Sequence, residues 1–184
     1  MPKPIVLAEP AASTSTTPGA PIAAIGGPVR RGPLRANAVI RRSVDGDTVE
    51  VSFTNKNNVA SSASESVRLI GIDTPETKRP DTPIECFGKK ASAATAALLP
   101  PGTPILLERD VEERDRYGRL LAYVFRASDG LFVNHELVRT GFAASYPYPP
   151  NVAYADSFRS AAELAQVVGV GLWGACGDPH VPTG

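Results

Sequence analysis

The alternation of hydrophobic and polar residues along the chain predicts a mainly β fold. Residues 48–53 (TVEVSF) alternate strictly, which is the period of a half-buried strand. Asp45-Gly46, just before them, is a hairpin turn signal that joins them to a first strand over residues 37–44. Three further strands are predicted over residues 65–73, 104–110 and 119–126.

Apolar residues at helical spacing predict three helices. An alanine-rich run over residues 87–99 is stopped by a Pro-Pro-Gly sequence, and a short helix over residues 132–140 is stopped by a glycine. A third helix over residues 153–168 has an apolar stripe that contains Phe158 and Ala162. Five strands with a helix between the third and fourth is the order of an OB-type barrel. We therefore predict an α+β, mainly β fold: a five-stranded OB-fold barrel with about three helices.

Composition divides the chain into three parts. Residues 1–34 are rich in Pro, Ala, Ser, Thr and Gly without hydrophobic periodicity, which predicts a flexible tail or linker. Residues 35–178 form the predicted domain, and residues 179–184 a C-terminal tail. No apolar run approaches the ~20 residues that a membrane helix needs. Prolines interrupt the apolar patch at the start, so we expect no clear signal peptide in this chain, and a signal or anchor upstream of it stays open.

The charge distribution points to local handling of any phosphate. The formal net charge is zero, which argues little for bulk attraction to nucleic acid. Residues 1–42 hold six basic residues against Glu9 alone, a net charge of +5, which leaves −5 for the rest of the chain. An acidic body that handles phosphates needs a cation, so this distribution favours a metal site over a broad basic patch.

Cys86 and Cys176 are the two cysteines of the chain. They are either two free core thiols or a disulfide that joins the middle of the chain to its end. A disulfide would close a loop of about 90 residues, would stabilise the fold by roughly 4 kcal/mol in the chain-entropy model, and would imply an oxidising compartment. Neither cysteine lies in a CxxC sequence, which argues against zinc and thioredoxin chemistry.

Four segments carry a resemblance to a known family. They are VDGDTV (44–49), VRLIGIDTPET (67–77), DRYGRLLAYVF (115–125) and the tyrosine pair in SYPYPP (145–150). In this order and spacing they resemble the staphylococcal nuclease (thermonuclease) family, from about residue 36 to residue 174. The resemblance implies a calcium-dependent phosphodiesterase that cuts DNA or RNA with little sequence specificity, by in-line attack of water that leaves 3′-phosphate products.

The resemblance also implies a calcium site. Asp47 and Asp73 match the carboxylate ligands, the backbone carbonyl of Thr74 matches a further ligand, and Asp45 is a neighbouring acid beyond the ligands. Hard oxygen ligands on a loose frame suit calcium, with waters completing the coordination. The alternative is that residues 45–47 are only a solvated hairpin turn.

Three further residues match the catalytic set of the family. Arg68 and Arg119 match a phosphate clamp, because guanidinium groups hold two phosphate oxygens and keep their charge. Glu76 matches the candidate general base for the attacking water. The alternative for Arg68 is a surface strand residue paired with Glu65 or Glu50.

A regular strand would place Arg68 and Asp73 on opposite faces, because they lie five positions apart. The two side chains can serve one site only if the strand bends or bulges between them. We predict this bend at Gly71.

Aromatic residues complete the site that the resemblance implies. Tyr117, Tyr146 and Tyr148 match nucleotide-binding tyrosines, and Arg116 stands beside them to contact a terminal phosphate. Aromatic faces stack on any base, which fits a nuclease without sequence preference that acts on single strands of DNA or RNA. Both histidines, His135 and His180, are expected to be structural or exposed.

Other interpretations predict different behaviour. A noncatalytic OB-type module would bind nucleic acid without calcium and without hydrolysis, although such domains usually lack one or more of the matched residues. Nothing in the sequence supports a calcium-dependent adhesion domain. We expect a monomer, and the cysteine pair favours an extracytoplasmic or secreted location.

Overall fold

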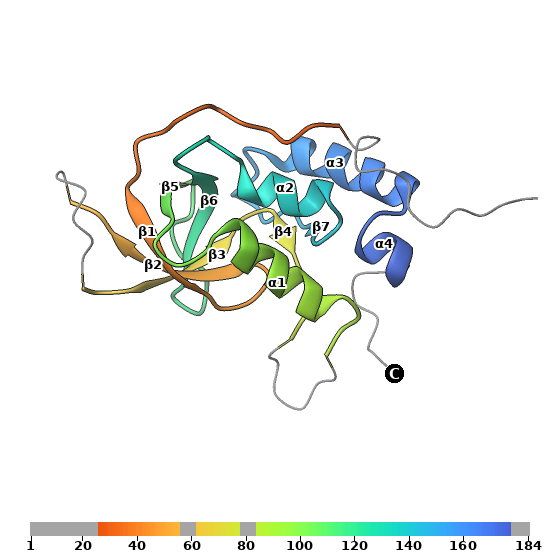
Figure 1. Cartoon of the computed structure of the whole chain (residues 1–184), viewed down its shortest axis with the longest axis horizontal. Coiled ribbons are helices and arrows are strands. Elements are labelled where there is room, and N and C mark those ends of the chain that lie inside the picture. Colours follow the sequence, from red (N-terminus) through yellow and green to blue (C-terminus); the bar gives the residue numbers. More distant parts are fainter. Residues whose placement is uncertain (1–25, 56–61, 78–83, 178–184) are drawn as a thin grey trace, which may run out of the picture.

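A computed structural model describes residues 26–55, 62–77 and 84–177 of the chain. Its centre is a closed barrel of five strands in the order β1-β2-β3-β6-β5, in which β5 pairs back onto β1 (Figure 1). The five strands are β1 (Ala38–Ser43), β2 (Thr48–Phe53), β3 (Glu65–Leu69), β5 (Pro104–Glu108) and β6 (Leu120–Arg126). The predicted mainly β barrel is therefore confirmed.

Closure of the barrel depends on one parallel pair of strands. β3 and β6 run parallel, with Val67 opposite Leu120, whereas the other neighbours in the barrel run antiparallel. Every residue of β6 except the last is buried, as expected for the strand that has the barrel core on one face and helices on the other. Because each strand has two neighbours, no edge is left open, and the loops at the barrel ends start from fixed positions.

The predicted bend after Arg68 is confirmed. β3 ends at Leu69, a turn follows, and a separate two-stranded sheet pairs β4 (Ile72–Asp73) with β7 (Ala144–Ser145). Gly71 has φ +79°, a backbone conformation that side chains rarely adopt. A Cβ there would also lie 2.4 Å from the ring of Phe158, so both conformation and space require glycine at this position.

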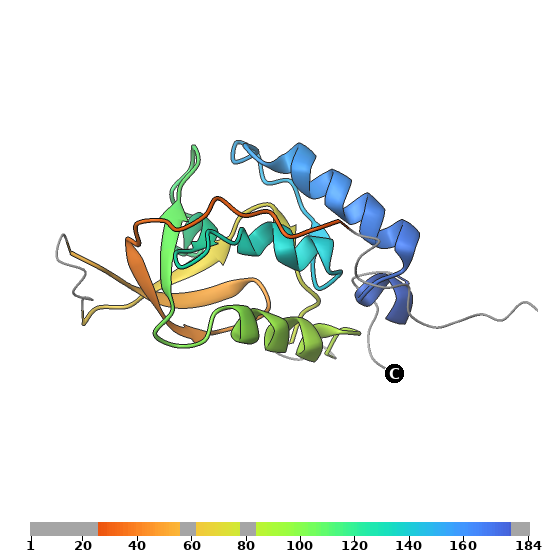
Figure 2. The same ribbon diagram turned by 45° about the horizontal axis from the view of Figure 1, so that its top comes forward.

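The predicted helices are confirmed with small shifts at their ends. They are α1 (Gly88–Leu98), α2 (Val133–Arg139) and α3 (Ala155–Val168), followed by a short α4 (Leu172–Ala175). α2 packs between β6 and α3, while α1 contacts both β1 and α2 (Figures 1 and 2). The predicted stripe of α3, including Phe158 and Ala162, is buried. In the described parts of the chain, none of the helices combines the length and apolar character needed to span a membrane.

Residues 26–34 lie against the domain and run along α2 (Figure 2). The main-chain N–H of Arg31 donates to the carbonyl of Gly130 at 3.1 Å. Its guanidinium lies 4.0 Å from the ring centre of Phe125 and forms an ion pair with Glu108 at 2.6 Å. Residues 26–34, which composition assigns to the flexible tail, are therefore attached to the folded domain. Composition does not reveal this, because main-chain hydrogen bonds do not require a periodic pattern of hydrophobic residues. The remaining parts of the predicted tails, residues 1–25 and 178–184, lie outside the described residues.

The two cysteines form a disulfide. Cys86 and Cys176 are bonded, with their Cα atoms 6.0 Å apart and 90 positions between them in sequence. The alternative of two free thiols is therefore wrong. The bond joins the segment before α1 to the end of α4, so it connects the two flanks of the domain.

Candidate active site

One pocket of about 960 Å³ lies at one side of the barrel. Its walls come from the turn between β1 and β2, the bend between β3 and β4, the loop between β5 and β6, and the segment before α3. It brings together all of the predicted metal-binding, catalytic and nucleotide-binding residues, which are Asp45, Asp47, Arg68, Asp73, Thr74, Glu76, Arg116, Tyr117, Arg119, Tyr146 and Tyr148.

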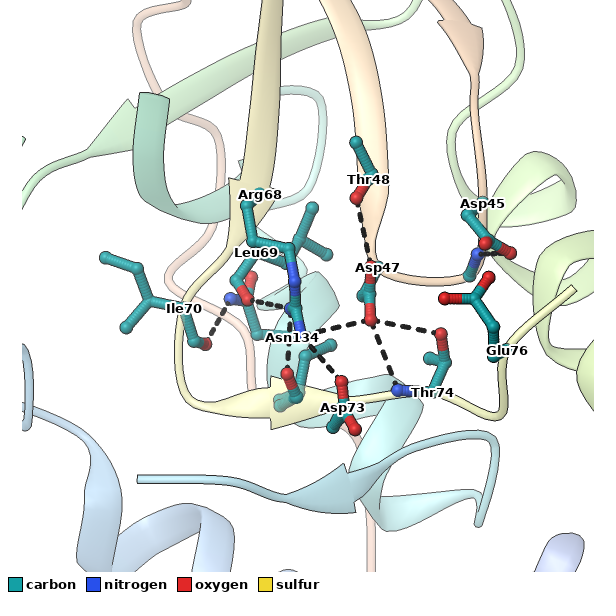
Figure 3. A network of polar contacts seen from close by, with 12 residues as sticks. Asp45, Asp47, Thr48, Arg68, Leu69, Ile70, Asp73, Thr74, Glu76 and Asn134 are labelled. Carbon is teal, nitrogen blue, oxygen red and sulfur yellow. Dashed lines mark hydrogen bonds and ion pairs between the residues drawn. The ribbon is translucent and has the colours of Figure 1, made fainter. Parts of the chain in front are cut away.

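The Arg68 guanidinium makes four contacts at the base of this pocket. Nη1 donates to the carbonyls of Leu69 at 2.7 Å and Ile72 at 2.8 Å. Nη2 donates to Asp73 Oδ1 at 2.7 Å and lies 3.1 Å from Asp47 Oδ2 (Figure 3). Because the chain turns back after Leu69, one arginine joins both acids that were predicted to bind the metal.

The alternative partners of Arg68 are engaged elsewhere. Glu50 forms an ion pair with Arg42, and Glu65 pairs with Arg114 at 3.0 Å. The alternative reading of Arg68 as a surface strand residue is therefore wrong, and its side chain is only 14% exposed.

Asn134 of α2 holds the bend between β3 and β4 by hydrogen bonds. Its Nδ2 donates to the carbonyl of Ile70 at 2.9 Å (Figure 3). Its Oδ1 accepts from the N–H of Val124 at 2.9 Å. Asn134 is completely buried, so both ends of its amide are satisfied away from water. The asparagine thereby holds the turn between Arg68 and Asp73 against β6.

Asp47 is held by hydrogen bonds on both carboxylate oxygens. Oδ2 accepts from the N–H and hydroxyl of Thr74 at 3.3 and 3.2 Å, and Oδ1 accepts from Thr48 Oγ1 at 3.0 Å (Figure 3). Gly46 permits the close approach, because a Cβ there would lie 2.6 Å from Thr74 Oγ1. Thr95 of α1 donates to the Gly46 carbonyl at 2.5 Å. A merely solvated hairpin turn does not describe this arrangement, because the Asp47 side chain is 12% exposed.

The acids of the site fit a hard cation. Asp73 Oδ1 lies 2.7 Å and Asp47 Oδ2 lies 3.1 Å from the same atom, Arg68 Nη2, so the two carboxylates face one point of the pocket. Carboxylate oxygens of this kind are the hard ligands that calcium prefers. Among the described residues, no group of three or more His, Cys, Asp or Glu side chains could hold a metal. A cation here therefore also needs backbone oxygens such as that of Thr74, and oxygens from water and substrate.

Glu76 and Asp45 form the acidic wall of the pocket. The carboxylate of Glu76 points toward the side of the site that Asp45 and Asp47 occupy (Figure 3). Asp45 Oδ1 accepts from the N–H of Gly46 and from Thr77 Oγ1, each at 2.8 Å. Burial raises the pKa of the Asp45 carboxyl, and the nearby negative charges of Asp47 and Glu76 raise it further, whereas the two hydrogen bonds oppose the shift.

Asp115 positions Arg119 on the opposite wall. Its Oδ2 accepts from Arg119 Nε at 2.7 Å, while its Oδ1 accepts from the backbone N–H groups of Tyr117 and Arg119 at 2.9 and 3.0 Å. Arg119 Nη1 reaches Thr48 Oγ1 at 3.4 Å, so the arginine extends toward the Asp47 side of the pocket. The Asp115 side chain is only 7% exposed, which makes this an anchored ion pair rather than a mobile surface one.

The tyrosines are exposed at the mouth of the pocket. Tyr117 and Tyr146 are 68% and 53% exposed, and Tyr148 is half-buried. The guanidinium carbon of Arg116 lies 4.7 Å from the ring centre of Tyr117, and that of Arg119 lies 5.5 Å from it. The mouth therefore combines aromatic faces with positive charge.

Asn151 fastens the two tyrosine-bearing segments together. Its Nδ2 donates to the carbonyl of Glu112 at 3.0 Å and its Oδ1 accepts from the N–H of the same residue at 2.7 Å. Asn151 is 1% exposed, so these two hydrogen bonds join the loop between β5 and β6 to the segment before α3 away from water.

Sequence reasoning missed several residues that shape the site. Asp115 and Thr48 had a signal, since they lie in the DRYGR and VDGDTV segments close to Arg119 and Asp47. Asn134 and Asn151 had none, because their partners lie far away in sequence.

Only one of the two histidines, His135, lies among the described residues. His135 is 8% exposed within α2 and does not line the pocket, so of the two predicted roles it has the structural one. Burial lowers the pKa of its imidazole. His180 lies outside the described residues.

Comparison with known proteins agrees with the geometry. A model of the staphylococcal nuclease homologue family matches residues 66–175. The thermonuclease of Staphylococcus hyicus is 37% identical over 132 residues, which are 72% of this chain and 72% of the relative. The thermonuclease of Staphylococcus intermedius is 38% identical over 135 residues, 73% of this chain and 74% of the relative.

A third relative comes from another genus. Endonuclease YncB of Bacillus subtilis (strain 168) is 36% identical over 143 residues, which are 77% of this chain but only 63% of the relative. The match to the family covers more than half of the chain, and it includes the bend, Glu76 after β4 and the loop that carries Arg119. The chain belongs to the staphylococcal nuclease family.

Proposed function

We propose that this chain is a calcium-dependent phosphodiesterase that hydrolyses DNA or RNA with little sequence preference. One observation carries the proposal: three separate segments, which carry Asp47, then Arg68, Asp73 and Glu76 together, and then Arg119, line one pocket. Membership of a family with thermonuclease and endonuclease relatives supports hydrolysis of phosphodiester bonds.

The two arginines bind the phosphate that is attacked. Arg119 is held at Nε by Asp115, and its Nη1 points across the pocket toward Thr48. Arg68 is held at the base by two carbonyls and two carboxylates. Preorganised positive groups stabilise the charge that gathers on phosphorus in the transition state.

Glu76 accepts the proton of the attacking water. Its carboxylate lies in the pocket beside Asp45, within reach of a water that attacks a phosphate held by the arginines. As the water oxygen bonds to phosphorus, its proton passes to Glu76 and the bond to the 5′ oxygen breaks. The leaving oxygen takes a proton from solvent water, Glu76 returns its proton to solvent, and the other product keeps a 3′-phosphate.

Asp47 and Asp73, with the carbonyl of Thr74, are the residues that would hold the calcium ion. Bound there, calcium supplies Lewis-acid polarisation of a phosphoryl oxygen. The residues themselves orient the site, because Asp47 is fixed by Thr48 and Thr74 and cannot swing away.

Tyr117, Tyr146 and Tyr148 support binding of single-stranded substrate. Exposed aromatic rings stack on bases of any identity, at about 1–3 kcal/mol per base. Arg116 beside Tyr117 adds a charge for a terminal phosphate. We also propose that the chain acts as a monomer in an extracytoplasmic or secreted setting, a location that the disulfide favours.

Cleavage of a single-stranded oligodeoxynucleotide tests the proposal, in calcium, in chelator and with Arg119→Ala. We expect 3′-phosphate products in calcium, none in chelator, and a kcat about 10²–10³-fold lower for Arg119→Ala. Arg109→Ala is the matched control, because Arg109 pairs with Glu113 outside the pocket. Cleavage that survives the chelator would exclude the metal mechanism, and binding without hydrolysis in every condition would identify a noncatalytic module.

A further inference from the structure

Glu85 closes a reciprocal pair of hydrogen bonds around the backbone of Glu76. Its Oε2 accepts from the N–H of Glu76 at 2.8 Å, and its own N–H donates to the carbonyl of Glu76 at 3.0 Å. The two bonds use both backbone polar groups of the residue that carries the candidate base. Glu85 is also one of the residues that line the pocket.

The residues after Glu85 hold it in place. Cys86 is bonded to Cys176, and the ring of Phe87 stacks on Phe142 with the ring centres 5.5 Å apart. Phe87 has φ +70°, an unusual conformation for a bulky residue, and it persists here between these two attachments.

Gly88, at the start of α1, lies close to the backbone of Pro75 and Glu76. A Cβ at this position would lie 3.0 Å from the carbonyl of Pro75 and 3.1 Å from that of Glu76. The start of α1 therefore approaches the backbone of Glu76 as closely as the chain allows. The three residues that follow Glu85 are therefore held by a disulfide, a stacked ring and a close backbone approach.

We infer that Glu85 is a positioning residue for Glu76, acting through its acceptor oxygen rather than through its charge. The inference rests on the proposed function, in which Glu76 accepts a proton from water. A glutamate side chain has three rotatable bonds, so a fixed backbone is needed before its carboxylate can be aimed. Misplacement of a catalytic group by about 1 Å can lower a rate by about 10²-fold, even from a change outside the reacting groups.

Three variants separate the acceptor from the charge. Glu85→Gln keeps an oxygen that can accept the N–H of Glu76, Glu85→Ala removes it, and Glu163→Ala is the matched control, since Glu163 is exposed on α3. With single-stranded DNA in calcium, we expect Glu85→Ala to lower kcat by about 10- to 100-fold while KM changes by less than about threefold. Glu85→Gln should restore most of kcat, and Glu163→Ala should match the parent.

A second readout does not depend on activity. Amide hydrogen exchange followed by NMR should show a protected Glu76 N–H in the parent and in Glu85→Gln, and loss of that protection in Glu85→Ala. Parental kcat and parental protection in Glu85→Ala would overturn the inference. So would a Glu85→Gln variant as slow as Glu85→Ala, because charge would then be the requirement. If the parent protein does not cleave, the proposed function fails, and the exchange data alone decide whether Glu85 holds Glu76.

Discussion

Arg68 occupies a position that four oxygen acceptors define. Two are backbone carbonyls on either side of the bend, and two are the carboxylates of Asp47 and Asp73. A planar guanidinium satisfies acceptors in several directions at once, which the single point charge of an ammonium does not. The side chain therefore joins the two segments that carry the acids as well as contributing charge.

Arg68→Lys should expose this difference. We expect kcat to fall by about 10²–10³-fold, because lysine keeps the charge but loses the forked geometry. Steady-state kinetics with single-stranded DNA measure the effect. Arg42→Lys is the control, since Arg42 pairs with Glu50 on the barrel surface and should leave kcat unchanged. A fully active Arg68→Lys enzyme would show that charge alone suffices.

His135 is buried between aromatic rings in α2. Its ring centre lies 6.2 Å from that of Phe132, and its Nδ1 is buried without a hydrogen-bond partner among the described residues. Burial lowers the pKa of the imidazole below its ordinary value, with an opposing contribution from Glu136 and a further lowering by Arg139. The folded protein therefore holds this histidine neutral at a pH where the unfolded chain begins to protonate it.

Stability should fall as the pH drops through the unfolded pKa of about 6.5. Below that value the unfolded state binds more protons than the folded state, so the free energy of unfolding decreases until the lower folded pKa is reached. Thermal unfolding between pH 7.5 and about 5.5 should show a smaller loss for His135→Gln than for the parent. Equal pH dependence in the two proteins would contradict the buried neutral state.

At the scale of elements, the bend between β3 and β4 brings the catalytic set together. A continuous strand would point the Asp73 side chain away from Arg68. The turn after Leu69 instead brings the two side chains to the same site. It is fixed by Asn134 at Ile70 and by the N–H of Tyr146, which donates to the Gly71 carbonyl at 2.9 Å. The segment that carries Tyr146 is thereby attached to the same turn.

Gly71→Ala should damage both fold and activity. The left-handed conformation costs an alanine about 1–2 kcal/mol, and displacement of the Phe158 ring adds to this. Gly102→Ala is the matched control, because Gly102 has φ +87° but no atom near the new Cβ. Urea unfolding should show a larger loss for Gly71→Ala, together with a lower kcat. Equal losses would mean that the ring adapts without penalty.

Local sequence patterns predict the strands and the bend at the site. They do not predict the hydrogen bonds between residues that are far apart in sequence. Strict alternation predicts β2, and the separation of Arg68 from Asp73 requires the bend. Asn134, however, binds a carbonyl 64 positions away. Asn151 binds Glu112 across 39 positions. Such side-chain to backbone bonds leave no period in the sequence, because they depend on how elements approach in space.

At the scale of the whole molecule, the disulfide links the flanks of the domain. Cys86 stands directly before α1 and next to Glu85, while Cys176 follows α4. Residues 26–34 cover a different flank, over β6 and α2, through hydrogen bonds of the main chain. The barrel is thus restrained by one covalent and one noncovalent attachment.

Removal of the disulfide should lower stability more than activity. Cys86→Ser combined with Cys176→Ser should reduce the free energy of unfolding by about 2–5 kcal/mol, as seen for native disulfides of small domains. Urea unfolding of the variant and the parent measures the difference. Treatment with a reducing agent should shift the parent toward the variant and leave the variant unchanged. An unchanged unfolding midpoint after reduction would show that packing alone holds α4.

The span between the cysteines has a consequence for survival among proteases. The exposed loop between β5 and β6 lies within that span, and exposed loop tips are the preferred places for nicking. A single hydrolysed peptide bond there would leave both fragments tethered through sulfur, and the strands of the two fragments would still pair around the barrel. The nicked chain would migrate as one species without reductant and as two with it.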